Sequence, residues 1–387
     1  MSRFAPYLGI VVATALFALV IFVANTVPEQ RLRTSATPSA TSTLSTEPGF
    51  IIPPISLPGL ESTTTSATSS IVAVRKPKKT VLPAPTTVPV PTPVVAPIPI
   101  SVSALPSLPA ANAALDAAAT ALRSALVNII CYVPAGSGLH SISGSGVFID
   151  PKGIILTNAH IAQYFLIADK GANCTIRSGS PAVDKYKAAL IYISPAWLKA
   201  NASVLTQTLP SGTGEYDFAF LAVTKSANGQ PLPDSYPSIS LATTPPDTGT
   251  PVVIATFGAQ FLASSQVQSS LFPTVVFGSV KDIFTFVTNT IDVLALGGSA
   301  AAQEGSSGGG VADASGNLVG TITTSTVSGT TDTRSLDAIT ASYIRADYAS
   351  ETGQALDLLL AQPTKTSIVD FAPQIPALEK IITVGLP

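Results

Sequence analysis

Residues Gly144 to His160, GSGVFIDPKGIILTNAH, give the clearest indication of the fold. They contain two short apolar, β-branched runs, Gly146–Ile149 and Gly153–Thr157, and a Pro-Lys-Gly turn signal lies between them. Such runs bounded by turn residues predict two short strands. His160 follows the second run directly, at a position where a strand can deliver a side chain to a cleft.

The same texture continues through the rest of the chain. Further short runs, such as Phe218–Val223 and Val252–Thr256, are separated by Gly, Pro, Asn and Ser. Regularly spaced short strands with turn signals predict a β sandwich or barrel, and the length suffices for two packed barrels. Ala111–Ile130 has the spacing of a helix that runs into a strand, and Ser350–Leu360 predicts a closing helix.

Composition excludes several classes of protein. The 387 residues carry a formal net charge of −2, and only 11% of them are charged. This balance excludes a strongly basic nucleic-acid binder. Two cysteines are too few for a zinc ribbon or a disulfide-dense scaffold, and 46% hydrophobic residues exclude a wholly disordered chain.

The first 110 residues differ from the rest. Residues 4–28 hold no charged side chain, and Tyr7–Ala24 is long enough to cross a bilayer, so residues 1–27 predict a transmembrane anchor. A cleaved signal peptide is the alternative. Residues 28–110 hold 16 of the 33 prolines and predict a disordered, Pro-rich linker with polyproline II character.

Two side chains are candidates for acid–base chemistry. An unperturbed histidine titrates near pH 6.5, which suits His160 for a general base, although a lone histidine is more often structural. The other histidine, His140, lies in a Gly/Ser-rich loop. Asp217 stands at the head of a strand. If its carboxylate is buried, it could orient a histidine; the alternative is an ordinary solvated aspartate at a strand end.

The segment Gly305–Gly309, GSSGG, is the third motif. Its glycines allow a tight turn that aims Ser307 outward and lets N–H groups converge on one point, as an oxyanion hole requires. A flexible loop or a phosphate cradle is the alternative. The phosphate cradle would need a Lys and a Ser or Thr after the glycines, and neither is present.

Together the three motifs resemble the trypsin-like (chymotrypsin-fold) serine proteases, and they are most similar to the HtrA/DegP branch. Gly144–His160 resembles the first-barrel signature, Asp217 with its Phe-Ala-Phe-Leu continuation resembles the aspartate motif, and Gly305–Gly309 resembles the nucleophile loop. The resemblance covers residues 112–361 and implies an all-β fold of two six-stranded antiparallel β-barrels.

The resemblance also implies roles for single residues. Ser307 would attack a peptide carbonyl, His160 would take its proton, and Asp217 would orient His160. The N–H groups of Gly305 and Ser307 would hold the oxyanion. By position, Thr323 would bond to Asp217, and Thr323, Thr324 and Ser325 would pair with the substrate backbone. Ala301 would lie near the floor of the specificity pocket and favour small or medium apolar side chains.

The expected domains are an anchor (1–27), a linker (28–110), the protease domain (111–361) and a C-terminal tail (362–387). The first barrel would run to about residue 235 and the second would begin at about 236. Too few residues follow 361 for the PDZ domain of the HtrA branch. Three features depart from the family: Ser306 replaces Asn or Asp, Gly310 replaces a proline and would loosen the loop, and a longer loop falls within Ser178–Gly214.

Cys131 and Cys174 flank the His160 motif, so a disulfide between them is compatible with the fold, and two free thiols are the alternative. A disulfide would require an oxidising compartment. The leading hypothesis is a membrane-anchored serine endopeptidase that acts outside the cytoplasm, in the periplasm or outside the cell. The alternative is an inactive protease-fold scaffold. We expect a peptide or unfolded protein as substrate, no cofactor, no metal ion and no nucleic acid, and the resemblance allows a homo-oligomer.

Overall fold

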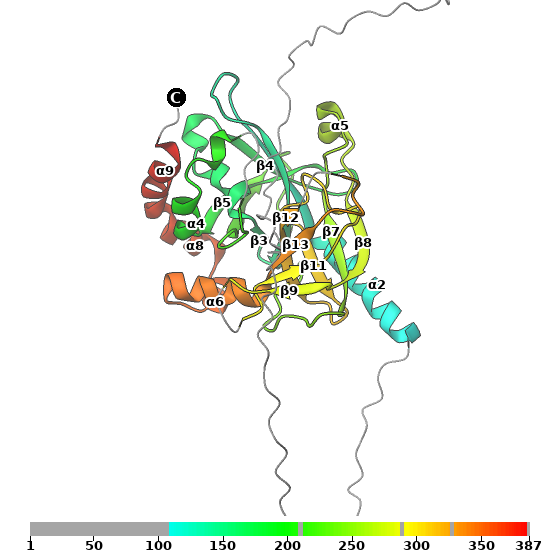
Figure 1. Cartoon of the computed structure of the whole chain (residues 1–387). Coiled ribbons are helices and arrows are strands. Elements are labelled where there is room, and N and C mark those ends of the chain that lie inside the picture. The colour runs from blue at the N-terminus through cyan, green and yellow to red at the C-terminus, as the bar shows by residue number, and fades with distance from the viewer. Residues whose placement is uncertain (1–107, 208–211, 287–289, 326–328, 385–387) are drawn as a thin grey trace, which may run out of the picture. The chain divides into compact units, whose positions relative to one another are not determined.

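A computed structural model describes residues 108–207, 212–286, 290–325 and 329–384 (Figure 1). The predicted anchor and almost all of the predicted linker lie outside these residues. No helix within the described ranges is long and apolar enough to cross a bilayer.

The first barrel is closed and six-stranded, as predicted. Helix α2 (Leu108–Ala125) runs directly into β1, and the strand order is β1-β2-β3-β6-β5-β4 with antiparallel neighbours. The strands are β1 (Leu126–Tyr132), β2 (Ile142–Asp150), β3 (Ile154–Thr157), β4 (Asn173–Ser178), β5 (Val183–Ile193) and β6 (Ala219–Ser226). Large side chains of its strands, such as Ile129, Ile155 and Phe220, are fully buried, and burial of apolar surface is the dominant favourable term in folding.

The second sheet differs from the prediction. It has seven strands in the order β8-β7-β11-β12-β13-β10-β9 and is not a closed six-stranded barrel. They are β7 (Pro251–Thr256), β8 (Thr274–Ser279), β9 (Asp282–Phe284), β10 (Val293–Ala295), β11 (Gly310–Asp313), β12 (Leu318–Ser325) and β13 (Leu336–Thr340).

The difference arises at Val280 and Lys281, which separate the two end strands. Val280 N donates to Thr250 O, whereas Lys281 N donates to Ala295 O. Within two residues, the backbone therefore stops pairing beside β7 and begins to pair with β10. This bend divides one strand of the expected barrel into β8 and β9.

The chain passes from one sheet to the other near residue 240. Ile239 N still donates to Phe148 O of the first barrel, whereas Leu318 N of the second sheet donates to Ser240 O. The predicted boundary at 235/236 falls within a few residues of this crossover.

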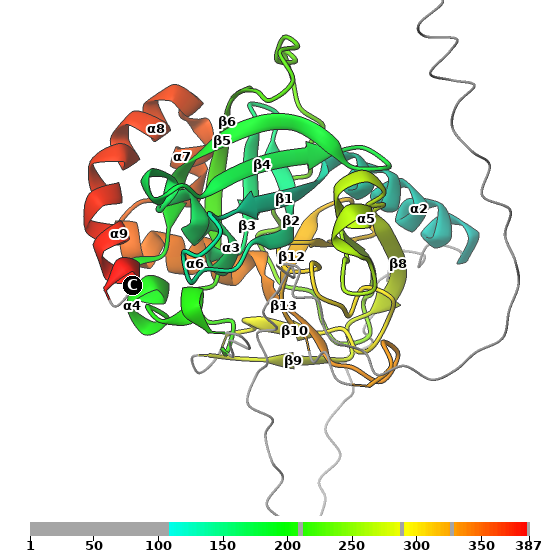
Figure 2. The same cartoon turned by 90° about the horizontal axis from the view of Figure 1, so that it is seen from above.

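Four helices follow β13 and correct the prediction of one closing helix and a tail. They are α6 (Ala341–Thr352), α7 (Leu356–Ala361), α8 (Thr364–Phe371) and α9 (Ile375–Thr383). Gly353, with φ of 72°, ends α6 inside the segment predicted as a single helix. Residues of the expected tail form α8 and α9, which lie along the flank of the first barrel (Figure 2), where α8 contacts β5 and α9 contacts α4 (Pro195–Ala200).

Candidate active site

His160 lies on the short helix α3 (Ala159–Ala162), immediately after β3. Its backbone N donates to Asp217 Oδ1 at 2.9 Å, and its Nδ1 lies 2.8 Å from Asp217 Oδ2. Asn158 Nδ2 adds a bond of 2.8 Å to the carbonyl oxygen of Asp217. The pairing of Thr157 with Ala219 brings these two strand ends together, so sheet register positions the pair.

Asp217 is fully buried, and a buried carboxylate is stable only with hydrogen-bond partners. Besides His160, Thr323 Oγ1 donates to Asp217 Oδ2 at 2.9 Å. The predicted bond from Thr323 is therefore present. Because Thr323 belongs to β12, the network joins both sheets. A carboxylate facing Nδ1 keeps the proton on that nitrogen and leaves Nε2 free to accept another.

The turn before Asp217 is strained. Tyr216 has φ of 60°, an uncommon value for a non-glycine residue. The Tyr216 N–H donates to the Tyr343 hydroxyl at 3.1 Å, which anchors the turn to α6. Gly214 lies against Thr323, where an added Cβ would come within 2.8 Å of Cγ2. The surroundings therefore fix the position of the carboxylate.

The loop Gly305–Gly309 distinguishes its two serines. Ser306 is buried, and its Oγ donates to Thr256 Oγ1 at 3.3 Å, whereas Ser307 is half-buried. Only the Ser307 hydroxyl is thus placed to meet a substrate. The departure at Ser306 is explained locally, because its hydroxyl finds a partner inside the second sheet.

Ser145 joins this loop to the first barrel through hydrogen bonds. The sequence did not predict this role, although Ser145 lies within the motif Gly144–His160. Its N donates to Ser307 O at 2.7 Å, and its Oγ donates to Gly305 O at 2.8 Å. The same Oγ accepts a bond of 2.8 Å from Phe257 N. One buried serine therefore connects β2, the nucleophile loop and the segment after β7.

The Gly305 and Ser307 N–H groups are the predicted donors of the oxyanion hole. Ala259 N donates to Glu304 O at 2.7 Å. In a planar trans peptide the N–H opposes the C=O, so this bond turns the Gly305 N–H away from Ala259. Within the described residues, neither the Gly305 N–H nor the Ser307 N–H has an acceptor. Gly305 has φ of 89°, and an added Cβ would lie 2.7 Å from Phe257 O, so the position needs glycine.

His160 Nε2 and Ser307 Oγ form no hydrogen bond in this structure. The described site thus contains the His160–Asp217–Thr323 network, and Ser307 is not hydrogen-bonded to His160. Catalytic hydrogen bonds are often long before substrate binds, so the arrangement is compatible with proton transfer.

Gly310, which was predicted to loosen the loop, occupies a tightly packed position. It is buried at the start of β11, where an added Cβ would come within 2.6 Å of Leu122 and 2.8 Å of Leu318. Glycine is needed because helix α2 packs its Leu122 against this strand. The first folded helix therefore supports the strand that follows the nucleophile.

The other predicted substrate contacts are placed less directly. Thr324 and Ser325 lie on β12, opposite Asp337 and Leu336 of β13. Their side chains lie outside the described part of the structure. Ala301 is fully buried, six residues before Ser307.

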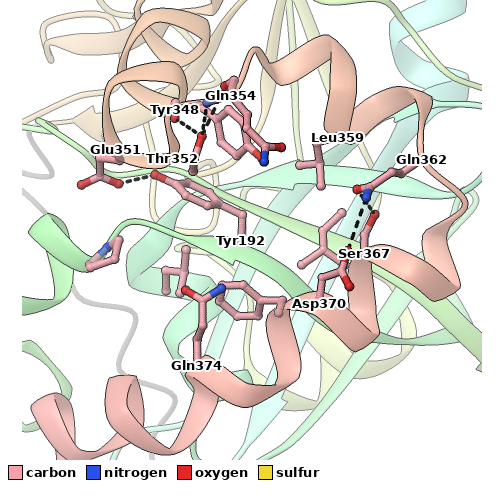
Figure 3. A pocket seen from close by; sticks show the side chains of 14 residues that line it. Tyr192, Tyr348, Glu351, Thr352, Gln354, Leu359, Gln362, Ser367, Asp370 and Gln374 are labelled. Atoms are coloured by element: carbon pink, nitrogen blue, oxygen red, sulfur yellow. Dashed lines mark hydrogen bonds between the residues drawn. The ribbon is translucent and has the colours of Figure 1, made fainter.

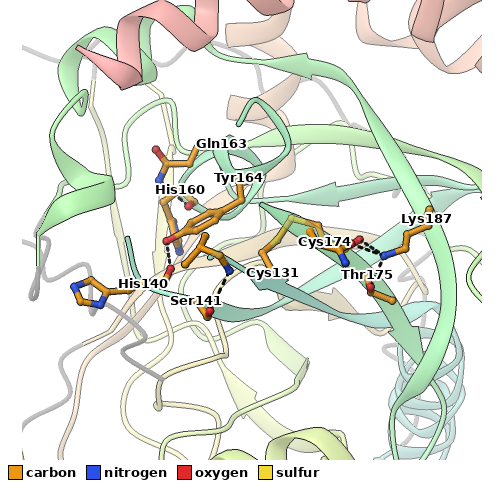
Figure 4. Close-up of a disulfide and its surroundings, with 11 residues drawn as sticks. Cys131, His140, Ser141, His160, Gln163, Tyr164, Cys174, Thr175 and Lys187 are labelled. Carbon is orange, nitrogen blue, oxygen red and sulfur yellow. Dashed lines mark hydrogen bonds between the residues drawn. A yellow bond between two sulfur atoms is a disulfide. The ribbon is translucent and has the colours of Figure 1, made fainter. Parts of the chain in front are cut away.

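The disulfide between Cys131 and Cys174 is present, and the free-thiol alternative is wrong (Figure 4). The two cysteines are directly opposite each other on β1 and β4. Lys187 Nζ lies beside it and donates to Cys174 O at 2.9 Å and to Thr175 Oγ1 at 2.7 Å. The disulfide therefore closes the first barrel near the loop that carries His140.

A cavity of about 370 Å³ lies away from this network, between β5 and helices α6 to α8 (Figure 3). Glu351 at its edge accepts hydrogen bonds from Tyr192 and from Ser194. His160, Asp217 and Ser307 do not line the cavity, so it is separate from the candidate active site.

Three carboxylates, Glu215, Asp347 and Glu351, lie near one another and near Tyr216. Burial raises the pKa of Asp347 from 3.8 to about 7, and the charges of Glu351 and Glu215 add to this effect. Asp347 Oδ2 is buried without a hydrogen-bond partner. Between about pH 4 and pH 7 the folded protein keeps a proton that the unfolded chain releases, so this group lowers stability as pH rises.

Replacing Asp347 by asparagine is therefore expected to raise Tm at pH 8 and to leave it nearly unchanged at pH 4. Asparagine removes the charge that is costly only at the higher pH. Calorimetric scans at both values test this, with Asp370→Asn on the exposed face of α8 as the control. An equal Tm difference at pH 4 and pH 8 would contradict the assignment.

The chain is similar to one family model and to several solved structures. Residues 144–320 match the model of the trypsin-like peptidase domain. The chain is similar to the solved Rv3671c protease of M. tuberculosis in its inactive form, with 19% identity, a TM-score of 0.39, and coverage of 64% of this chain and 98% of that one. It is similar to Deg5 with 14% identity, a TM-score of 0.41, and coverage of 63% and 97%. No curated protein matches the chain. The matched residues contain His160, Asp217 and Ser307, and this part of the chain is a trypsin-like peptidase domain.

Proposed function

We propose that the protein is a serine endopeptidase that hydrolyses peptide bonds through an acyl-enzyme. One observation carries the proposal: a buried carboxylate bonded to His160 lies in the same domain as an accessible serine flanked by two N–H groups without acceptors. This combination supplies a base, a nucleophile and an oxyanion hole, which are the three parts that acyl transfer needs.

In the proposed reaction, Ser307 Oγ attacks the peptide carbonyl carbon as His160 Nε2 takes the hydroxyl proton. The carbonyl oxygen becomes an oxyanion, which the N–H groups of Gly305 and Ser307 stabilise. His160 then gives its proton to the leaving amine and the acyl-enzyme forms. Water repeats the sequence with His160 as base and frees Ser307. Asp217 stays ionised throughout and stabilises the imidazolium.

The proposed substrate is an extended peptide or an unfolded protein. Its backbone would pair with Thr323, Thr324 and Ser325 at the end of β12, as an added strand does. The small, neutral Ala301 favours a small or medium apolar side chain before the cleaved bond.

The proposed location is the outer face of a membrane, with residues 1–27 as anchor and the Pro-rich segment as spacer. The Cys131–Cys174 disulfide supports this location, because disulfides persist in oxidising compartments. The site would then act at a distance from the bilayer that the spacer sets.

A fluorophosphonate probe tests the activity and its site. The purified full chain is expected to gain one covalent adduct, and peptide mass spectrometry is expected to place it on Ser307 and not on the buried Ser306. An adduct on intact cells from a membrane-impermeant probe, recovered with the membrane fraction, would support the location. A folded protein that gains no adduct would contradict the proposal, and an adduct only after lysis would contradict the location.

The second candidate is an inactive scaffold with a protease fold. The described residues hold no hydrogen bond between Ser307 and His160, and a serine that stayed without one would not be activated. The two candidates predict opposite outcomes of the labelling experiment.

A further inference from the structure

Arg334 is a buried cation at the centre of the second sheet's loops. Arg334 is only 5% exposed, and no carboxylate of the described residues forms an ion pair with it. Its guanidinium instead binds neutral oxygens. Nη1 donates to Gln260 Oε1 at 2.6 Å and to Ala302 O at 2.8 Å, while Nε and Nη2 both donate to Gly329 O. The guanidinium also lies 5.7 Å from the ring centroid of Phe261.

Two of these partners flank the bond that orients the Gly305 peptide. Gln260 directly follows Ala259, whose N–H binds Glu304 O. Ala302 precedes Glu304 by two residues. The guanidinium therefore connects both segments that meet at this bond, and it fixes the distance between them.

The same cation also acts on the Glu304 side chain through its charge. Burial raises the pKa of the Glu304 carboxyl, and the Arg334 charge acts against that rise. Arg334 thus favours the ionised form of the residue whose carbonyl is held by Ala259.

An arginine suits this position better than a lysine. Its planar fork presents five N–H donors in fixed directions, and here four donor contacts reach three separate segments. An ammonium group offers three donors from one point, so it cannot span Gln260, Ala302 and Gly329 in the same way.

We infer that Arg334 is a positioning residue for the oxyanion hole: it holds the Ala259 and Glu304 segments together so that the Gly305 N–H faces the cleft. The inference rests on the proposed peptidase function. It adds a residue outside the three motifs whose effect on the reaction passes through Gln260 and Ala302.

Steady-state hydrolysis of a p-nitrophenyl ester by the full chain tests this role. Loss of one oxyanion-hole donor lowers kcat about 10²- to 10³-fold in related chemistry, so its partial displacement in Arg334→Gln should lower kcat roughly 10- to 100-fold with KM within about threefold. Arg345→Gln is the matched control, because Arg345 also binds two backbone carbonyls, Leu241 O and Ala242 O, and contacts neither segment. It should keep kcat within about twofold of wild type.

Milder variants separate positioning from folding. Gln260→Ala removes one acceptor and should lower kcat without a large change in Tm, whereas Gln260→Glu keeps an acceptor and should retain kcat. The double variant Arg334→Gln/Gln260→Ala should fall little further than Arg334→Gln, since both changes break one linkage.

Hydrogen exchange of the peptide that contains Ala259 gives a readout that needs no activity. Exchange should accelerate in Arg334→Gln and Gln260→Ala, and stay unchanged in Arg345→Gln. Unchanged exchange, or equal kcat losses in the Arg334 and Arg345 variants, would overturn the inference. An inactive wild type would instead contradict the proposed function, and the exchange result would still decide the role of Arg334.

Discussion

Replacing Ser307 by alanine is expected to lower kcat for a peptide or ester substrate about 10⁶-fold, the order found when a nucleophilic serine is removed from another serine protease. Alanine deletes the atom that forms the acyl-enzyme, so no other group can complete the covalent step. The remaining rate of hydrolysis should be the rate that substrate binding and the two backbone N–H groups of the oxyanion hole support without a nucleophile. The measurement is steady-state hydrolysis with enzyme concentrated enough to follow slow turnover.

Ser306→Ala is the matched control for this prediction. It deletes the same atom one residue earlier, where the hydroxyl is buried and bonded to Thr256. We expect kcat to stay within about tenfold of wild type, with the loss of one neutral hydrogen bond seen as a small decrease in Tm. If the two alanine variants lost activity equally, the assignment of Ser307 as the nucleophile would be wrong.

Replacing Asp217 by asparagine is expected to lower kcat about 10⁴-fold while the fold persists. The asparagine amide is close in size to the carboxylate, and its oxygen can still accept from the His160 backbone N–H. Its NH₂ group would face Nδ1 as a donor, which favours the proton on Nε2. The histidine would then present a proton to Ser307 in place of a lone pair.

The Asp217→Asn prediction has a signature beyond the rate. Because the imidazole would hold the wrong tautomer, activity should recover in part as pH rises and hydroxide takes over the role of the base, whereas Ser307→Ala should show no recovery. Thr323→Val is the milder comparison, since it removes one of three hydrogen bonds to the carboxylate and should lower kcat by about tenfold or less. An unchanged rate for Asp217→Asn would exclude this carboxylate from the mechanism.

The sequence was sufficient to predict the first barrel, and the family resemblance supplied the His160–Asp217–Thr323 network. His160 follows β3, Asp217 precedes β6 and Thr323 lies in β12. Strand register then brings the three together. The prediction failed for the second sheet at Val280 and Lys281, where the change of partner depends on backbone carbonyls of Thr250 and Ala295. Residue types do not indicate which distant backbone carbonyl accepts such a hydrogen bond.

The supporting residues were harder to foresee. The packing at Gly310 depends on Leu122, which is far away in sequence and occupies the space that a side chain at position 310 would need. Arg334 carried one signal, since it is the only basic residue between Lys281 and Arg345 in a charge-poor segment. Isolation alone does not say what a cation binds, because its partners here are carbonyl and amide oxygens that any residue can supply.

The bond between Asp217 and Thr323 spans 106 residues and has a consequence for biosynthesis. The Cys131–Cys174 pair spans 43 residues, so the first barrel can close and oxidise while the second is still being made. Ser307 and Thr323, the last partner of the carboxylate, are added only when translation reaches the second sheet. The candidate active site is therefore incomplete in any nascent chain that still lacks the second sheet.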